Sequence, residues 1–186
     1  MRETTRRKLL EGALKVFLVD PGASIEEVAD RSDTSRSTLY RYFPTRSELL
    51  RALTEYADEA ATEALGPLFR KPLGGAELLR EVVRALLPLG DAFRFLWRQG
   101  PELMDEWTER TRMENARFWA LVVASLRADG LVDPALPDEW VRWTLEGQLY
   151  AVWESVAAGE IAPVKAPEFV VRTVTRGIGP IEGERS

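Results

Sequence analysis

The chain has 186 residues, of which 45% are hydrophobic, and it contains neither cysteine nor histidine. Disulfides, zinc sites built on cysteine and histidine, and nucleophile–histidine catalytic pairs are therefore excluded. This length and composition allow one compact domain or two small ones with a buried core. No apolar run approaches the roughly 20 residues that a bilayer-spanning helix needs, and no secretory signal follows the basic N-terminus, so we expect a cytoplasmic protein.

Charge is unevenly distributed along the chain. Residues 1–54 carry 10 basic against 8 acidic residues, a net charge of +2, whereas residues 55–186 carry 15 against 22, a net charge of −7. A basic N-terminal segment on an acidic body is compatible with contact between that segment and a polyanion. Scattered surface charge would give the same totals, so sequence motifs have to decide between the two interpretations.

Prolines and glycines separate segments of helical periodicity, and strict alternation of apolar and polar residues is rare, so the sequence predicts an all-α fold. Ser24 with Glu27, and Thr45 with Glu48, have the spacing of a capping box, which predicts where two of the helices begin. The predicted helices span about residues 5–19, 24–31, 35–43, 45–65, 101–128, 138–158 and 167–178.

The second and third of these helices are short and are separated by a polar turn at residues 32–34. With the first helix before them, they predict a helix-turn-helix, in which the later helix enters a DNA groove. Ile25, Val28, Leu39 and Phe43 can form its interior. The outward side chains of the third helix combine arginine, hydroxyl and tyrosine groups, which suit base edges and phosphates. A short amphipathic helix with a solvated polar face is the alternative.

Residues 5–53 resemble the N-terminal domain of TetR-type transcriptional repressors. The most specific stretch is 35–50, with Thr38-Leu39-Tyr40, then Phe43-Pro44, then a basic residue and two leucines. The resemblance implies that the start of the third helix faces base edges and that its tyrosines, the start of the second helix and the start of the fourth helix contact phosphate. Tyr42 replaces the more usual histidine and keeps a hydrogen-bond donor without a charge. The expected DNA-binding residues are Ser24, Arg36, Ser37, Thr38, Tyr40, Arg41, Tyr42 and Arg46.

We expect a DNA-binding domain at residues 1–50 and a helical effector-binding and dimerisation domain at residues 51–186. The helix at 138–158 is apolar on two sides, so one side can close the core while the other meets a partner. We therefore predict that the last two helices pair with their copies across a two-fold axis, as the resemblance also implies. The expected interface residues are Val141, Leu145, Val152, Val170 and Val174.

All six tryptophans lie outside the first domain, and aromatic residues are candidates for an effector pocket. They suggest an apolar effector, neutral or cationic. Aromatic residues at helical spacing also form ordinary cores, and the one acid among the candidates is equally compatible with a surface charge. The candidate pocket residues are Phe93, Trp97, Trp107, Phe118, Trp143, Glu146 and Tyr150.

The function that these patterns favour is a transcriptional repressor that binds a palindromic operator as a dimer and is released by a small apolar effector. The alternative is a helical ligand- or partner-binding protein without DNA binding, although that protein would be expected to lose the outward residues of the third helix. An enzyme is disfavoured. The candidate catalytic acids, which are Asp91, Glu102, Asp105 and Glu106, lie next to breaks between helical segments, where acids are typical of helix N-termini. We expect no catalytic site, no metal and no cofactor.

Overall fold

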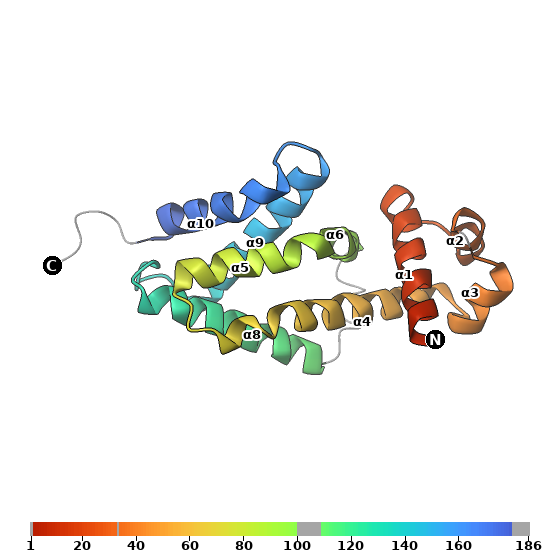
Figure 1. The fold of residues 1–186 in the computed structure, drawn as a ribbon, viewed down its shortest axis with the longest axis horizontal. Coiled ribbons are helices and arrows are strands. Elements are labelled where there is room, and N and C mark those ends of the chain that lie inside the picture. Colours follow the sequence, from red (N-terminus) through yellow and green to blue (C-terminus); the bar gives the residue numbers. More distant parts are fainter. Residues whose placement is uncertain (1, 33, 100–108, 180–186) are drawn as a thin grey trace. The chain divides into compact units, whose positions relative to one another are not determined.

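A computed structural model describes residues 2–32, 34–99 and 109–179 of the chain (Figure 1). Within these ranges the regular elements are α-helices and one-turn 3-10 helices, which confirms the predicted all-α fold. No helix in the described ranges is long and apolar enough to cross a membrane. The α-helices are α1 (Arg2–Val19), α2 (Ile25–Arg31), α3 (Arg36–Tyr42), α4 (Arg46–Leu65), α5 (Gly75–Leu86), α6 (Gly90–Arg98), α8 (Glu109–Ala128), α9 (Asp138–Ala157) and α10 (Ala166–Gly177).

Two of these helices, α5 and α6, lie between residues 65 and 101, where the sequence analysis assigns no helix. A one-turn helix at Leu87–Leu89 separates them. Pro88 has no backbone N–H and cannot extend the hydrogen-bond ladder of α5, which is why the chain turns there. The other predicted helices agree with the structure at their ends to within a few residues, apart from the one expected to begin near residue 101. Its first residues, up to 108, lie outside the described ranges.

The chain forms two compact units. The N-terminal unit comprises Met1–Ala60 together with Asp91–Thr108, and the C-terminal unit comprises Ala61–Gly90 together with Glu109–Ser186. The chain passes from one unit to the other within α4, at the start of α6 and between residues 108 and 109. Each unit has its own buried residues and is described separately below.

The N-terminal unit is built around the apolar stripes of α1, α2, α3 and α4. The side chains predicted to fill the helix-turn-helix, Ile25, Val28, Leu39 and Phe43, are buried, as expected. Phe17 of α1 stacks on Phe95 of α6, with ring centroids 5.1 Å apart and the ring planes 8° from parallel. Because this helix comes from a distant part of the sequence, the unit does not end where the first four helices end.

In the C-terminal unit, α5 packs against α8 and α10, and α9 packs against the same two helices. The beginning of α5 is capped from outside, because the carboxylate of Asp129 accepts a 2.6 Å hydrogen bond from the backbone N–H of Gly75. Its end is held by α9, since the indole N–H of Trp153 donates to the carbonyl oxygen of Leu86 at 3.1 Å. These contacts satisfy backbone groups that a helix end leaves without partners.

Candidate nucleic-acid interface

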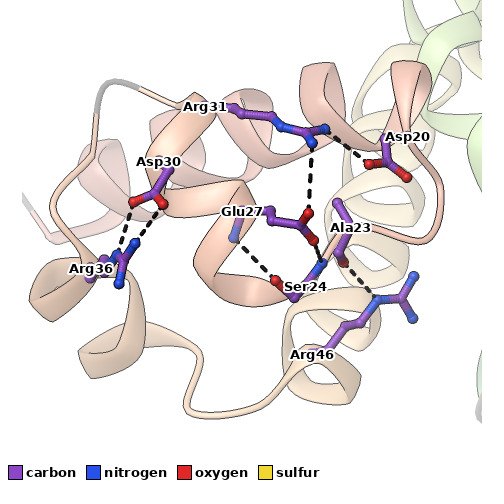
Figure 2. Close-up of polar contacts among 8 residues, drawn as sticks. All are labelled: Asp20, Ala23, Ser24, Glu27, Asp30, Arg31, Arg36 and Arg46. Carbon is purple, nitrogen blue, oxygen red and sulfur yellow. Dashed lines mark hydrogen bonds and ion pairs between the residues drawn. The ribbon is translucent and has the colours of Figure 1, made fainter.

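Local capping sets the two short helices of the helix-turn-helix (Figure 2). The hydroxyl of Ser24 accepts from the backbone N–H of Glu27 at 3.2 Å, and the Glu27 carboxylate accepts from the backbone N–H of Ser24 at 2.7 Å. The predicted capping box at α2 is therefore confirmed, and these hydrogen bonds lower the pKa of Glu27. Ser35 caps α3 through its hydroxyl alone, which accepts from the backbone N–H of Thr38 at 3.2 Å. The Ser24 hydroxyl still has its own proton to donate to a phosphate.

The side chains of α3 divide into four stripes, because successive residues of an α-helix turn by about 100°. Leu39 and Phe43 form the buried stripe, with Ser37 and Arg41 directly opposite and exposed. The flank toward α2 carries Arg36 and Tyr40, and the other flank carries Thr38 and Tyr42. All six predicted contact residues of α3 thus keep exposed surface, and two of them lie at the outermost position of the helix.

Two acids of α2, which the sequence analysis did not select, hold the inner flank of α3. Asp30 accepts two hydrogen bonds from Arg36, at 2.9 Å from Nε and 2.5 Å from Nη2 (Figure 2). Glu26 accepts a hydrogen bond from the Tyr40 hydroxyl. The hydrogen bonds lower the pKa of both carboxyls, so both acids carry charge beside the predicted DNA contacts. Glu26 and Asp30 are one helical turn apart, but this spacing identifies them as partners of α3 only when the residues of α3 that face them are known.

Arg46 lies at the beginning of α4 and points toward the link between α1 and α2, as Figure 2 shows. Its Nε donates to the carbonyl oxygen of Ala23 at 3.1 Å, and its Nη2 donates to that of Pro21 at 2.6 Å. Its guanidinium also lies over the ring of Phe17, 5.4 Å from the centroid. The phosphate contact expected for this residue stays a prediction, and the structure gives the side chain a role in holding the fold as well.

Residues 9–53 match the family model of bacterial regulatory proteins of the tetR family. The HTH-type transcriptional repressor LfrR of Mycolicibacterium smegmatis is 30% identical over 184 residues, which cover 95% of this chain and 92% of that protein. The chain belongs to the tetR family. It is thus a transcriptional regulator with a helix-turn-helix DNA-binding domain.

Solved structures of the family share the fold of this regulator. The crystal structure of LfrR from Mycobacterium smegmatis in complex with proflavine has a TM-score of 0.76 at 25% identity, over 97% of this chain and 99% of that one. A TetR-like regulator from Rhodococcus sp. RHA1 has a TM-score of 0.72 at 24% identity, over 92% and 93% of the two chains. The second likeness concerns the fold alone.

The predicted pocket residues of the regulator fall in both units. Phe93 and Trp97 belong to α6 in the N-terminal unit. Phe118 of α8 and Trp143, Glu146 and Tyr150 of α9 belong to the C-terminal unit. Trp107 lies outside the described residues. The structure therefore brings together at most four of the seven within one described unit, and the role of all seven stays a prediction.

Glu146 is the one charged residue among these candidates, and its side chain is 12% exposed. Arg142, one turn earlier on α9, donates to it at 2.8 Å. Burial raises the pKa of Glu146 in spite of that partner. Arg142 also donates to Glu139, whose pKa is lowered by this hydrogen bond, and its guanidinium lies 4.2 Å from the ring centroid of Trp143. Two carboxyl groups, a guanidinium cation and an aromatic ring therefore form one contiguous group on α9.

The five side chains expected at the dimer interface are already buried within their own chain: Val141, Leu145, Val152, Val170 and Val174. Their role at a dimer interface stays a prediction, and their burial within one chain does not support it. On the same two helices the large hydrophobic side chains that remain exposed are Trp140 and Trp143 of α9 and Phe169 of α10. A partner that meets α9 and α10 therefore has these residues available.

Among the described residues, no group of three or more acidic side chains is arranged so that it could hold a metal ion.

Proposed function

We propose that this regulator is a repressor that binds a near-palindromic operator as a homodimer and is released by a small-molecule effector. The observation that carries the proposal is the outer surface of α3, where six side chains suited to DNA keep exposed surface on a helix-turn-helix with both short helices capped. The relative LfrR is named a repressor, which supports the direction of control. Such a protein would act in the cytoplasm, where bacterial DNA lies.

The contacts divide by their position on α3 and around it. Ser37 and Arg41 lie outermost and would reach deepest into the major groove, with Arg36 and Thr38 at their sides. Hydroxyl groups of Ser24, Tyr40 and Tyr42 and the charge of Arg46 would contact phosphates, which position the protein without reading sequence. Two copies related by a two-fold axis would place half-sites about 10 base pairs, or a multiple of that, apart.

For the homodimer we propose the exposed faces of α9 and α10 as the interface. A helix that keeps large apolar side chains in water after closing its own core is a surface suited to a partner. Trp140 of α9 and Phe169 of α10 are exposed on these two helices, together with Trp143. Sedimentation of the wild type at micromolar concentration should give a dimer, and Trp140→Glu should shift it toward monomer. A wild-type monomer would contradict the proposal.

For the effector we propose a flat aromatic cation or a compound of similar shape. LfrR has been crystallised with proflavine, which is a planar aromatic cation. In this chain, Trp143, Tyr150 and Phe118 supply aromatic surface to the C-terminal unit, and Glu146 supplies a partly enclosed acid. Aromatic rings and a carboxylate are the groups that bind such a cation.

The test of DNA binding is a selection of bound sequences from random duplex DNA, followed by affinity measurements over a range of salt concentrations. A near-palindromic consensus and a steep salt dependence are expected, because phosphate contacts release counterions. Arg41→Ala should weaken operator binding, whereas Arg70→Ala, an exposed arginine of the C-terminal unit, should leave it unchanged. If the selection enriches no sequence and the measured binding does not depend on salt, the alternative of a helical ligand-binding protein without DNA binding is favoured.

The effector is tested separately, with proflavine as the probe. Tryptophan emission should change on titration, and saturating proflavine should weaken operator affinity. Linkage requires the reverse as well, so operator DNA should weaken proflavine binding by the same factor. Proflavine that binds the protein without changing operator affinity would contradict the proposed release.

A further inference from the structure

Two acid–donor pairs, one helical turn apart, join α2 and α3 in addition to their buried apolar contact. On α2 the acids are Asp30 and Glu26, and on α3 the donors are Arg36 and Tyr40. Asp30 and Arg36 are well exposed, at 53% and 60% of their side-chain surface, so the pair lies at the rim of the surface proposed to face DNA. The hydrogen bonds that lower the pKa of Asp30 also raise that of Arg36, and both groups stay charged near neutral pH.

The donors of Arg36 can be counted. A guanidinium has five N–H bonds, one on Nε and two on each Nη nitrogen. Asp30 occupies the edge formed by Nε and Nη2 with both of its oxygens. The other edge, formed by Nη1 and the second hydrogen of Nη2, keeps two parallel N–H bonds. Two parallel donors are what guanine O6 and N7 accept in the major groove.

We propose that Asp30 determines base specificity: it holds Arg36 so that the free edge of the guanidinium recognises one guanine in each half-site. The inference rests on the proposed function of α3 as the DNA-reading helix. An unrestrained arginine on a surface samples many rotamers and can equally contact a phosphate. A bidentate carboxylate fixes both the position and the plane of the guanidinium, so the ordering is already present before DNA arrives.

The carboxylate of Asp30 increases base specificity in this proposal, but it should lower the overall affinity for DNA. It adds a negative charge near the phosphate backbone, which weakens binding to every duplex by a similar factor. Removing it should therefore increase non-specific binding while selectivity for guanine falls. A carboxylate that only withheld Arg36 from DNA would behave differently, because its removal would raise affinity and leave or increase selectivity.

Glu26 provides the matched control. It carries the same charge on the same face of α2, one turn away, and its hydrogen bond goes to Tyr40 rather than to Arg36. Glu26→Ala should therefore reproduce the change in phosphate repulsion without the loss of Arg36 orientation. Both variants change exposed side chains of one short helix, so helix content measured by circular dichroism should stay at the wild-type level.

The experiment uses the full chain and the operator found by selection. Arg36→Ala identifies the guanine position, because only that position should lose its preference. Wild type should bind guanine there about tenfold or more tightly than adenine, as expected for a good bidentate pair. Replacing the guanine by 7-deazaguanine, which lacks N7, should remove most of this advantage. Inosine, which keeps O6 and N7 and lacks only the minor-groove amine, should leave binding nearly unchanged.

Asp30→Ala should reduce the guanine-to-adenine ratio to within about threefold of unity and should abolish the penalty of 7-deazaguanine, whereas Glu26→Ala should keep both. In the Arg36→Ala background, Asp30→Ala should have no further effect on base preference. The inference would be overturned if the Asp30→Ala variant kept the guanine-to-adenine ratio and the 7-deazaguanine penalty of the wild type. It would also be overturned if no guanine in the operator depended on Arg36 for its recognition. A wild type that selects no duplex at all would instead contradict the proposed function.

Discussion

The Nε–H of Arg46, at the start of α4, donates a 3.1 Å hydrogen bond to the carbonyl oxygen of Ala23, in the link between α1 and α2. The same guanidinium donates to Pro21 and lies over the ring of Phe17. Carbonyl groups in a tight link have no helical partner and must be satisfied by a side chain or by water. Arg46 therefore connects the beginning of α4 to the segment that positions α2.

Replacing Arg46 by alanine should lower the free energy of unfolding by about 1–3 kcal/mol, because two hydrogen bonds from a charged donor are lost. Lysine should restore little of this, since an ammonium cannot reproduce the planar fork. Urea unfolding measures the change, with Arg51→Ala as the control, because Arg51 is an exposed arginine of the same helix. If the Arg46→Ala variant is as stable as the wild type but binds all duplexes more weakly, Arg46 acts only as a phosphate contact.

Ser24 should contribute to stability through the capping box of α2. Ser24→Ala removes the acceptor for the N–H of Glu27 and should lower the free energy of unfolding by about 1 kcal/mol. Ser47→Ala, at an exposed serine in the first turn of α4, should change it by a few tenths at most. Equal effects of the two substitutions on the urea midpoint would contradict the structural role of the cap.

The features that the sequence predicted well depend on neighbours a few residues apart. The capping box at Ser24 and the buried stripe of α3 require only local spacing, so they could be found without coordinates. The partners of Arg46 lie 23 and 25 residues earlier in the chain, and nothing in the local pattern distinguishes a backbone contact from a phosphate contact. Arg36 could be recognised as an outward residue, whereas its pairing with Asp30, six residues earlier, depends on how α2 and α3 lie against each other.

Periodicity also leaves the partner of an apolar face undecided. Val141 and Val174 lie on apolar faces, as predicted, but those faces close the C-terminal unit itself. The sequence shows that a face must be covered and does not say whether the same chain or a second copy covers it. The contribution of α6 to the N-terminal unit was missed for a related reason, because Phe95 is far from Phe17 in the chain and no local pattern links them.

Two helical glycines should respond to alanine in opposite directions. A Cβ atom at Gly75 would lie 2.7 Å from the Cα of Leu126 and from the carbonyl oxygen of Ser125, so α5 and α8 would have to separate. Gly75→Ala should destabilise the protein by about 1–3 kcal/mol. At Gly147 the added Cβ would meet nothing within 4 Å beyond its chain neighbours and the adjacent backbone of α9, and alanine should stabilise α9 by about 0.5–1 kcal/mol. Thermal unfolding of both variants measures the contrast, and a stabilised Gly75→Ala protein would contradict the close packing of α5 on α8.

The pH dependence of stability should reveal the enclosed carboxyl of Glu146. Burial raises the pKa of Glu146 above its ordinary value of 4.5 in the folded state. Between these two pKa values the folded protein binds more protons than the unfolded chain, so stability falls as pH rises. The contribution of this group is fully present below pH 4.5 and is lost as pH rises through the folded pKa. Glutamine does not titrate, so the free energy of unfolding of wild type minus that of Glu146→Gln should decrease across this window.

Glu139 shares the same arginine and provides the control, because its pKa is lowered by the hydrogen bond from Arg142. Its contribution to stability is present above its ordinary pKa of 4.5 and is lost as pH falls through the lower folded value. The difference between wild type and Glu139→Gln should therefore increase with pH over the acid range, opposite in sign to the difference for Glu146. Urea unfolding at a series of pH values gives both differences, and comparing variants cancels the titration of the other carboxyls. A difference for Glu146→Gln that is flat, or that increases with pH, would show that the pairing with Arg142 outweighs burial at this site.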